Sequence, residues 1–147
     1  MDNYTQTVLS DSVYFRQMEL YVESQYHRGR PYIGEYLDEV TGYWLKGDQE
    51  RSRYYNHSTF NDLMITGLIG LRPRLDNTIE VNPLIPVDKW GLFCCENWLY
   101  HGHNLTILWD KNGDRYHCGK GLRIFVDGKE VGHADTLTRI VCKDVLK

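Results

Sequence analysis

Hydrophobic and polar positions divide the chain into two halves with different periods. Within residues 11–26, one set of mostly apolar and aromatic side chains recurs at spacings of three and four, which places it on one face of a helix. This stripe consists of Tyr14, Met18, Tyr21, Val22 and Gln25. We expect Asp11 or Ser12 to cap the helix, and Gly29 followed by Pro31 to end it.

A second helix is predicted over residues 60–71, with Ser58 as its cap, Gly67 and Gly70 near its end and Pro73 forbidding continuation. The segment is apolar nearly all round, as in a helix that is buried on several sides. The helical half is too small to close a core of its own, so this helix packs on the second half or on sequence outside the chain. Without a barrel around it, we expect an exposed apolar surface formed by Phe60, Leu63, Ile65 and Leu68.

From Leu75 onward the chain consists of short alternating runs separated by turn residues. The expected strands lie at 78–82, 105–109, 122–126 with its return at 129–131, and 138–142. Asp127-Gly128 is a strong two-residue hairpin signal. Regularly spaced short strands favour an antiparallel β-sandwich, so we divide the chain into a helical part, residues 1–73, and a β domain, residues 74–147.

Composition and charge narrow the function classes. The net charge of −3 provides no basic field, which argues against a nucleic-acid partner. No apolar run approaches the roughly 20 residues of a membrane helix, so no membrane partner is expected. The first twelve residues lack the pattern of a signal peptide, which leaves the location of a longer parent protein, cytoplasmic or periplasmic, undecided.

The cysteines and histidines give no clear metal signal. Cys94, Cys95, Cys118 and Cys142 form no CxxC pair and no readable disulfide framework. His101 and His103 would share one face of a strand, but no third ligand is apparent. We favour a structural histidine pair and expect neither a metal nor a cofactor.

The stretch 27–55 is the first place to look for chemistry, because long segments without a clear period are often functional. The chain is rich in tyrosine and tryptophan, whose flat rings with polar tips suit sugar stacking. Tyr36, Tyr43 and Trp44 fall within this stretch and can either stack on a sugar or serve as packing residues.

Residues 31–73, PYIGEYLDEVTGYWLKGDQERSRYYNHSTFNDLMITGLIGLRP, resemble the closing segment of the (α/α)6-barrel glycosidases related to glycoside hydrolase family 63. That group includes mannosylglycerate hydrolases and α-glucosidases. The strings VNPLIP, ENWLYHGHNLTILWD and GKGLRIFVDGKEV look like the β domain that follows such barrels. The resemblance implies an α+β chain, in which terminal helices of an (α/α)6 barrel precede an antiparallel β-sandwich.

In this group the general base is a glutamate that opens a segment of the form E-x-x-x-x-x-T-G. Glu35 matches that position, with Thr41-Gly42 at the end of the segment. The resemblance therefore implies that Glu35 activates water in an inverting reaction, while Asp38 and Glu39 are neighbouring alternatives. The partner acid lies in an earlier segment of the family, and nothing in this chain matches it. We expect the chain alone to be inactive.

The same region supplies candidate substrate-binding residues. Asn56 and His57 precede the second helix at the expected mouth of the barrel, where His57 can bind a sugar hydroxyl or help to cap the helix. Trp44 and Tyr36 complete the predicted binding set.

The leading hypothesis is the base-bearing part of a glycoside hydrolase, which the resemblance implies to be α-specific and inverting. Its expected partners are a glycoside or oligosaccharide substrate and the remainder of the catalytic barrel. The alternative is a non-catalytic β-sandwich module that packs on a barrel or binds carbohydrate. A third reading is a truncated gene product whose Met1 is an internal start.

Overall fold

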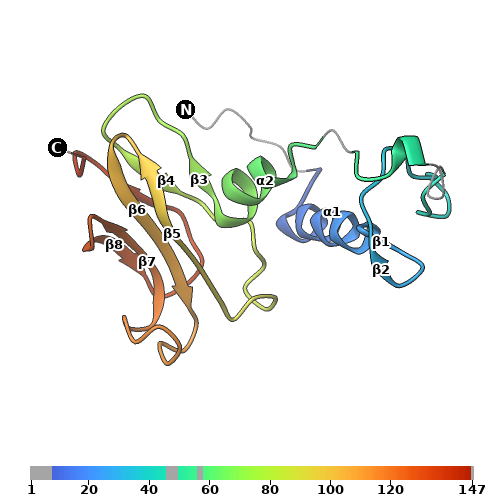
Figure 1. Ribbon diagram of the computed structural model, residues 1–147. Helices are drawn as coiled ribbons and strands as arrows, with labels where there is room; N and C mark the ends of the chain where they lie inside the picture. Colours follow the sequence, from blue (N-terminus) through green and yellow to red (C-terminus); the bar gives the residue numbers. More distant parts are fainter. Residues whose placement is uncertain (1–7, 46–49, 56–57, 147) are drawn as a thin grey trace. The chain divides into compact units, whose positions relative to one another are not determined.

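The computed structural model describes residues 8–45, 50–55 and 58–146 (Figure 1). The chain separates into two compact units, Met1–Asn61 and Asp62–Lys147. This division falls before the domain boundary that we expected between residues 73 and 74. That domain boundary stays a prediction. In the described part of the chain, no helix is long and apolar enough to cross a bilayer.

The first unit begins with helix α1 (Asp11–Ser24). Its cap is Ser10, not Asp11 or Ser12, because Ser10 has an extended backbone and its hydroxyl accepts a hydrogen bond from Val13 N at 3.3 Å. The helix buries Phe15 and Met18. The predicted stripe is therefore only partly correct, since Val22, one of its members, is 48% exposed.

The helix ends at Ser24, earlier than expected, because a short antiparallel hairpin follows at once. Its strands are β1 (Tyr26–His27) and β2 (Arg30–Pro31). Arg28 and Gly29 form the turn with φ angles of 52° and 73°, a left-handed pair typical of a two-residue hairpin. Gly29 thus turns the hairpin and does not end the helix.

The second predicted helix begins as expected but changes its winding. Helix α2 (Phe60–Leu63) continues into the π-helix η2 (Met64–Ile69), and Ser58 Oγ accepts a hydrogen bond from Phe60 N at 3.0 Å. Gly70 ends the helix with a φ of 86°, and its N–H donates to the carbonyl of Ile65.

The expected exposed apolar surface on this helix is only partly present. Leu63 is exposed, and Phe60 and Ile65 are half-buried, but Leu68 is only 2% exposed. The carbonyls of Gly67 and Gly70 accept hydrogen bonds from the backbone N–H groups of Leu84 and Asn82, so the end of the helix is anchored to the chain that follows β4. This anchoring accounts for the burial of Leu68.

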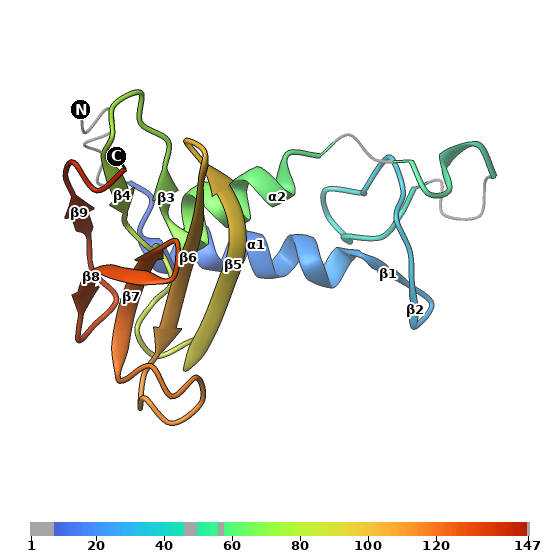
Figure 2. The ribbon, with the colours of Figure 1, turned by 60° about the vertical axis from the view of Figure 1, so that its left-hand side comes forward.

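The second unit contains two antiparallel sheets (Figure 2). The three-stranded sheet has the order β3-β4-β9, and the four-stranded sheet has the order β5-β6-β7-β8. The bounds are β3 (Leu71–Arg72), β4 (Ile79–Val81), β5 (Leu92–Tyr100), β6 (His103–Asp110), β7 (Gly121–Val126), β8 (Lys129–Ala134) and β9 (Ile140–Cys142). Helices followed by antiparallel sheets confirm the expected α+β class.

The core of this unit draws on both sheets. The fully buried aliphatic side chains of its strands are Ile79, Val81, Leu105, Ile107, Leu122 and Ile124. They alternate along β4, β6 and β7, as expected for strands with one face toward a core. The hairpin between β7 and β8 turns at Asp127-Gly128 as predicted, with Val126 paired to Lys129.

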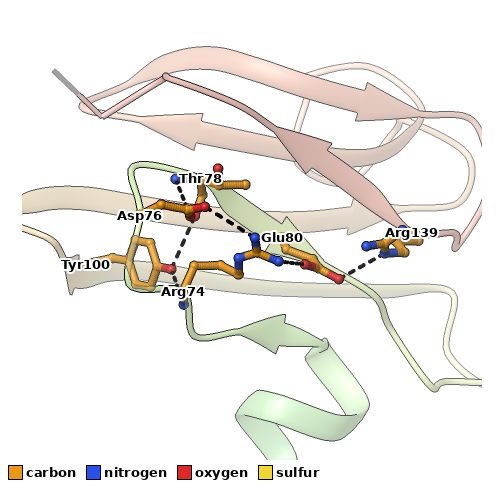
Figure 3. A network of polar contacts seen from close by, with 6 residues as sticks. All are labelled: Arg74, Asp76, Thr78, Glu80, Tyr100 and Arg139. Atoms are coloured by element: carbon orange, nitrogen blue, oxygen red, sulfur yellow. Dashed lines mark hydrogen bonds and ion pairs between the residues drawn. The ribbon is translucent and has the colours of Figure 1, made fainter. Parts of the chain in front are cut away.

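A polar network connects the two sheets (Figure 3). The carboxylate of Glu80, on β4, accepts hydrogen bonds from Arg74 Nη1 at 3.0 Å and from Arg139 Nε at 2.9 Å. The hydroxyl of Tyr100, on β5, accepts a hydrogen bond from Arg74 N at 3.1 Å. Glu80 is only 7% exposed, and its two partners neutralise a charge that would otherwise be buried alone.

Candidate functional site

Glu35 stands directly before a closed backbone loop in the first unit. The N–H of Leu45 donates to the carbonyl of Tyr36 at 3.0 Å, and the N–H of Asp38 donates to the carbonyl of Tyr43 at 2.8 Å. Leu37 and Trp44 also pair as an isolated antiparallel bridge. These contacts define the Glu35 loop, residues 35–45, which is a small hairpin and not the irregular coil that the sequence suggested.

Asp38 is used to build this loop. Its Oδ1 accepts hydrogen bonds from Val40 N at 3.0 Å, Thr41 N at 2.7 Å and Thr41 Oγ1 at 2.9 Å. The backbone N–H of Thr41, followed by its hydroxyl and the N–H of Val40, lowers the pKa of Asp38. Gly42 completes the turn with a φ of 68°. The carboxylate that rivals Glu35 most closely in position is thus engaged in holding the turn.

Glu35 itself is half-buried. The hydrogen bond to Glu35 raises the pKa of the Tyr36 hydroxyl, and the negative charge of Glu35 adds to this effect. The positive charge of Arg51 lowers the pKa of the same hydroxyl, and Tyr55 raises it slightly.

Trp44 and Tyr36, both predicted to bind substrate, lie in different surroundings. Tyr36 is 45% exposed, whereas Trp44 is 7% exposed and packs edge-on against Tyr32 with ring centroids 5.4 Å apart. Tyr32 in turn lies 5.3 Å from the ring of His27. A Cβ at Gly34 would approach both Tyr32 and Trp44 to 2.7 Å, so only glycine fits beside this aromatic cluster.

Asn56 and His57, the other two predicted substrate-binding residues, lie outside the residues that the structure describes. Their roles, and that of Trp44 and Tyr36 toward a sugar, stay predictions.

A cleft that sequence reasoning missed opens beside the β1–β2 hairpin. Its volume is about 490 Å³, and its lining residues are His27, Arg28, Arg30, Pro31, Tyr32, Arg53 and Tyr54. The Arg-Gly-Arg turn was visible in the sequence, but Arg53 follows more than 20 residues later. The hydrogen bond from Tyr54 N to the carbonyl of Ile33, 2.8 Å long, holds that later segment near the hairpin.

The histidines of the second unit do not form the expected pair. His101 lies in the turn between β5 and β6 with a φ of 51° and stacks on Tyr100, while His103 begins β6. His103 Nδ1 lies 2.7 Å from Asp127 Oδ2, and this contact is the main cause of the lowered pKa of Asp127. Across the described ranges, no group of three His, Cys, Asp or Glu side chains could hold a metal ion.

Two domain families match this chain in succession. Residues 4–58 match the mannosylglycerate hydrolase MGH1-like glycoside hydrolase domain. Residues 71–133 match the C-terminal domain of glycosyl hydrolase family 65. The chain is part of an MGH1-like, family 65-related glycoside hydrolase. The resemblance to mannosylglycerate hydrolases is confirmed, and the β domain is assigned to the type described for family 65.

A solved structure also matches nearly the whole of this chain. A chain named "Sialidase" is 89% identical in sequence over 99% of this hydrolase segment, with a TM-score of 0.94. This segment covers 14% of that solved chain. Most of the matching protein therefore has no counterpart in these 147 residues.

Proposed function

We propose that this segment supplies the general base of a longer, inverting glycoside hydrolase, and that Glu35 is that base. The observation that carries the proposal is the environment of Glu35: this half-buried carboxylate raises the pKa of the neighbouring Tyr36 hydroxyl, while Asp38 is occupied by the turn. In the E-x-x-x-x-x-T-G pattern, the threonine and glycine are the residues Thr41 and Gly42, which close the loop that follows Glu35.

In the proposed reaction Glu35 takes a proton from water as the oxygen of that water attacks the anomeric carbon. A second carboxyl group, from the part of the hydrolase outside this segment, protonates the leaving oxygen. Inversion requires the two carboxyl groups to stand roughly 6.5–9.5 Å apart, which leaves room for the water. The segment contributes one member of this pair.

The name of the 89% identical solved chain favours a substrate of the sialoside class. The match to the MGH1-like domain favours mannosylglycerate instead. Both substrates carry a carboxylate, on the released sugar in the first and on the group attached to the sugar in the second. We propose that the longer hydrolase acts on an α-linked glycoside of this acidic kind.

The test is Glu35→Gln in the longer hydrolase, assayed on an aryl sialoside and on mannosylglycerate. We expect kcat to fall by about 10²- to 10⁴-fold, the usual contribution of a general base. NMR of the first-formed product should show the inverted anomer. Glu96→Gln, an exposed position on β5, is the matched control and should leave kcat unchanged.

Three results would contradict the assignment. Full activity in Glu35→Gln would remove Glu35 from the chemistry, and loss of turnover in Glu39→Gln alone would transfer the role to that neighbour. A retained anomer would show that the carboxylate acts as a nucleophile and not as a base.

A further inference from the structure

The cleft beside the β1–β2 hairpin has a strongly cationic lining. Three of its seven lining residues are arginines, Arg28, Arg30 and Arg53, and none of the seven is acidic. Concave surfaces lined by one sign of charge concentrate ligands of the opposite sign. The cleft therefore has the charge of an anion-binding site.

Two of these arginines have no counter-ion among the residues that the structure describes. Among the residues that the structure describes, no hydrogen bond or ion pair joins the side chain of Arg30 or Arg53 to another group. Other arginines are paired: Arg16 contacts Glu23, and Arg123 contacts Glu130. Arg30 and Arg53 thus place two guanidinium groups without such a partner in one cleft.

A buried hydroxyl group provides an independent observation. Tyr32 lines the cleft and is only 8% exposed, yet its Oη is buried and has no hydrogen-bond partner in the described part of the chain. Burying a hydroxyl without a partner destabilises a protein, so such groups are expected to have a function or a ligand. A ligand oxygen in the cleft would satisfy it.

We infer that this cleft binds the carboxylate of an acidic glycoside, through Arg30 and Arg53 with Tyr32 as a hydroxyl donor. The planar guanidinium matches a carboxylate with two parallel hydrogen bonds, which a neutral sugar hydroxyl cannot provide. The inference deepens the proposed hydrolase function and rests on it for the identity of the substrate. The carboxylate belongs either to the sugar itself, as in a sialoside, or to the attached group, as in a glycerate glycoside.

The first experiment measures binding to the 147-residue chain by NMR titration with N-acetylneuraminic acid, its methyl ester and D-glycerate. We expect at least one of the two acids to bind and the ester to bind at least tenfold more weakly, because esterification removes the charge. Arg30→Gln and Arg53→Gln should each weaken binding of that acid about tenfold, the loss expected for one charge-assisted hydrogen bond. Arg115→Gln, which removes the same charge from an exposed site outside the cleft, is the matched control and should bind normally.

Tyr32→Phe separates a ligand contact from a structural role. It removes only an unpaired buried hydroxyl, so the midpoint of urea unfolding should stay the same or rise. Binding of the acid should nevertheless weaken several-fold. Unchanged binding in Tyr32→Phe would exclude the hydroxyl from the site.

The outcomes distinguish this inference from the proposed function. In the longer hydrolase, Arg30→Gln should raise KM for the acidic substrate about tenfold with kcat retained, whereas Glu35→Gln should lower kcat with binding retained. If the ester binds as tightly as the acid, or if Arg115→Gln weakens binding as much as Arg30→Gln, the anion site is refuted while Glu35 remains testable by its own kcat. Preference for N-acetylneuraminic acid or for glycerate identifies the source of the carboxylate.

Discussion

Replacing Glu80 by glutamine tests whether the network in Figure 3 stabilises the β domain. The substitution keeps the size of the side chain but removes the charge that Arg74 and Arg139 share. A hydrogen bond to a charged group contributes about 1.5–3 kcal/mol. Glutamine retains one acceptor oxygen, and the side chains of Arg74 and Arg139 are 31% and 46% exposed, so water replaces part of what is lost. We therefore expect Glu80→Gln to lower the free energy of unfolding by about 2 kcal/mol at pH 7.

The pH dependence of this loss is its specific signature. Burial raises the pKa of Glu80, but Arg139 and then Arg74 lower it by more, so the pKa in the folded state lies below the ordinary value. A lowered folded-state pKa means that the carboxylate contributes stability above its unfolded-state pKa and loses that contribution as the pH falls through the folded-state pKa. The difference between wild type and Glu80→Gln should be full near neutral pH and shrink in acid.

The assay is urea unfolding at several pH values between 2.5 and 7, a range of roughly two units on either side of an ordinary carboxyl pKa, followed by circular dichroism in the β region. Glu96→Gln serves as the matched control, since Glu96 is exposed. A Glu80→Gln variant as stable as wild type at pH 7, or a difference that stays constant down to the lowest pH, would refute the electrostatic role of the network.

Two further predictions concern the backbone and the thiols. Gly70→Ala places a Cβ 2.2 Å from the Asn82 backbone at a φ of 86°, so we expect urea unfolding to show at least about 3 kcal/mol of destabilisation. The control is Gly128→Ala, where φ is 80° and the space is open, and we expect it to cost about 1 kcal/mol. Equal losses in the two variants would contradict the argument that the added Cβ overlaps the Asn82 backbone. Burial, with a smaller effect of Cys94, raises the pKa of Cys95 to about 11. Iodoacetamide at pH 8 should therefore modify the exposed Cys118 much faster than Cys95, because the thiolate is the reactive form. Peptide mapping by mass spectrometry measures the two rates. Equal rates at the two thiols would show that Cys95 is accessible in solution.

The candidate site was only partly predictable from its residues. Glu35 was singled out by the pattern ending in Thr41-Gly42, and the structure adds the contacts that explain this pattern. The role of Asp38 could not be read in advance, because a carboxylate three residues before a threonine is compatible with either a turn or a catalytic group. The acceptance of three hydrogen bonds from Val40 and Thr41 decides between these uses.

Strand β5 shows a different limit. Its residues do not alternate regularly between buried and exposed, because a bulge shifts the register between Cys95 and Trp98, and Asn97 has a φ of 62°. Pairing with β6 stabilises this strand despite its irregular pattern. The sequence period alone therefore could not identify it.

The sequence by itself determined the features that depend on near neighbours. These are the helical period before Tyr26, the start of α2 just after Ser58, the alternation of β4, β6 and β7 and the hairpin at Asp127-Gly128. Each follows from local backbone preference and the direction of successive side chains, which a few consecutive residues specify. Only the tertiary structure decided the cap at Ser10, the Glu80 network and the arginine cleft, because competing caps differ little in local preference and the other two join residues far apart in sequence.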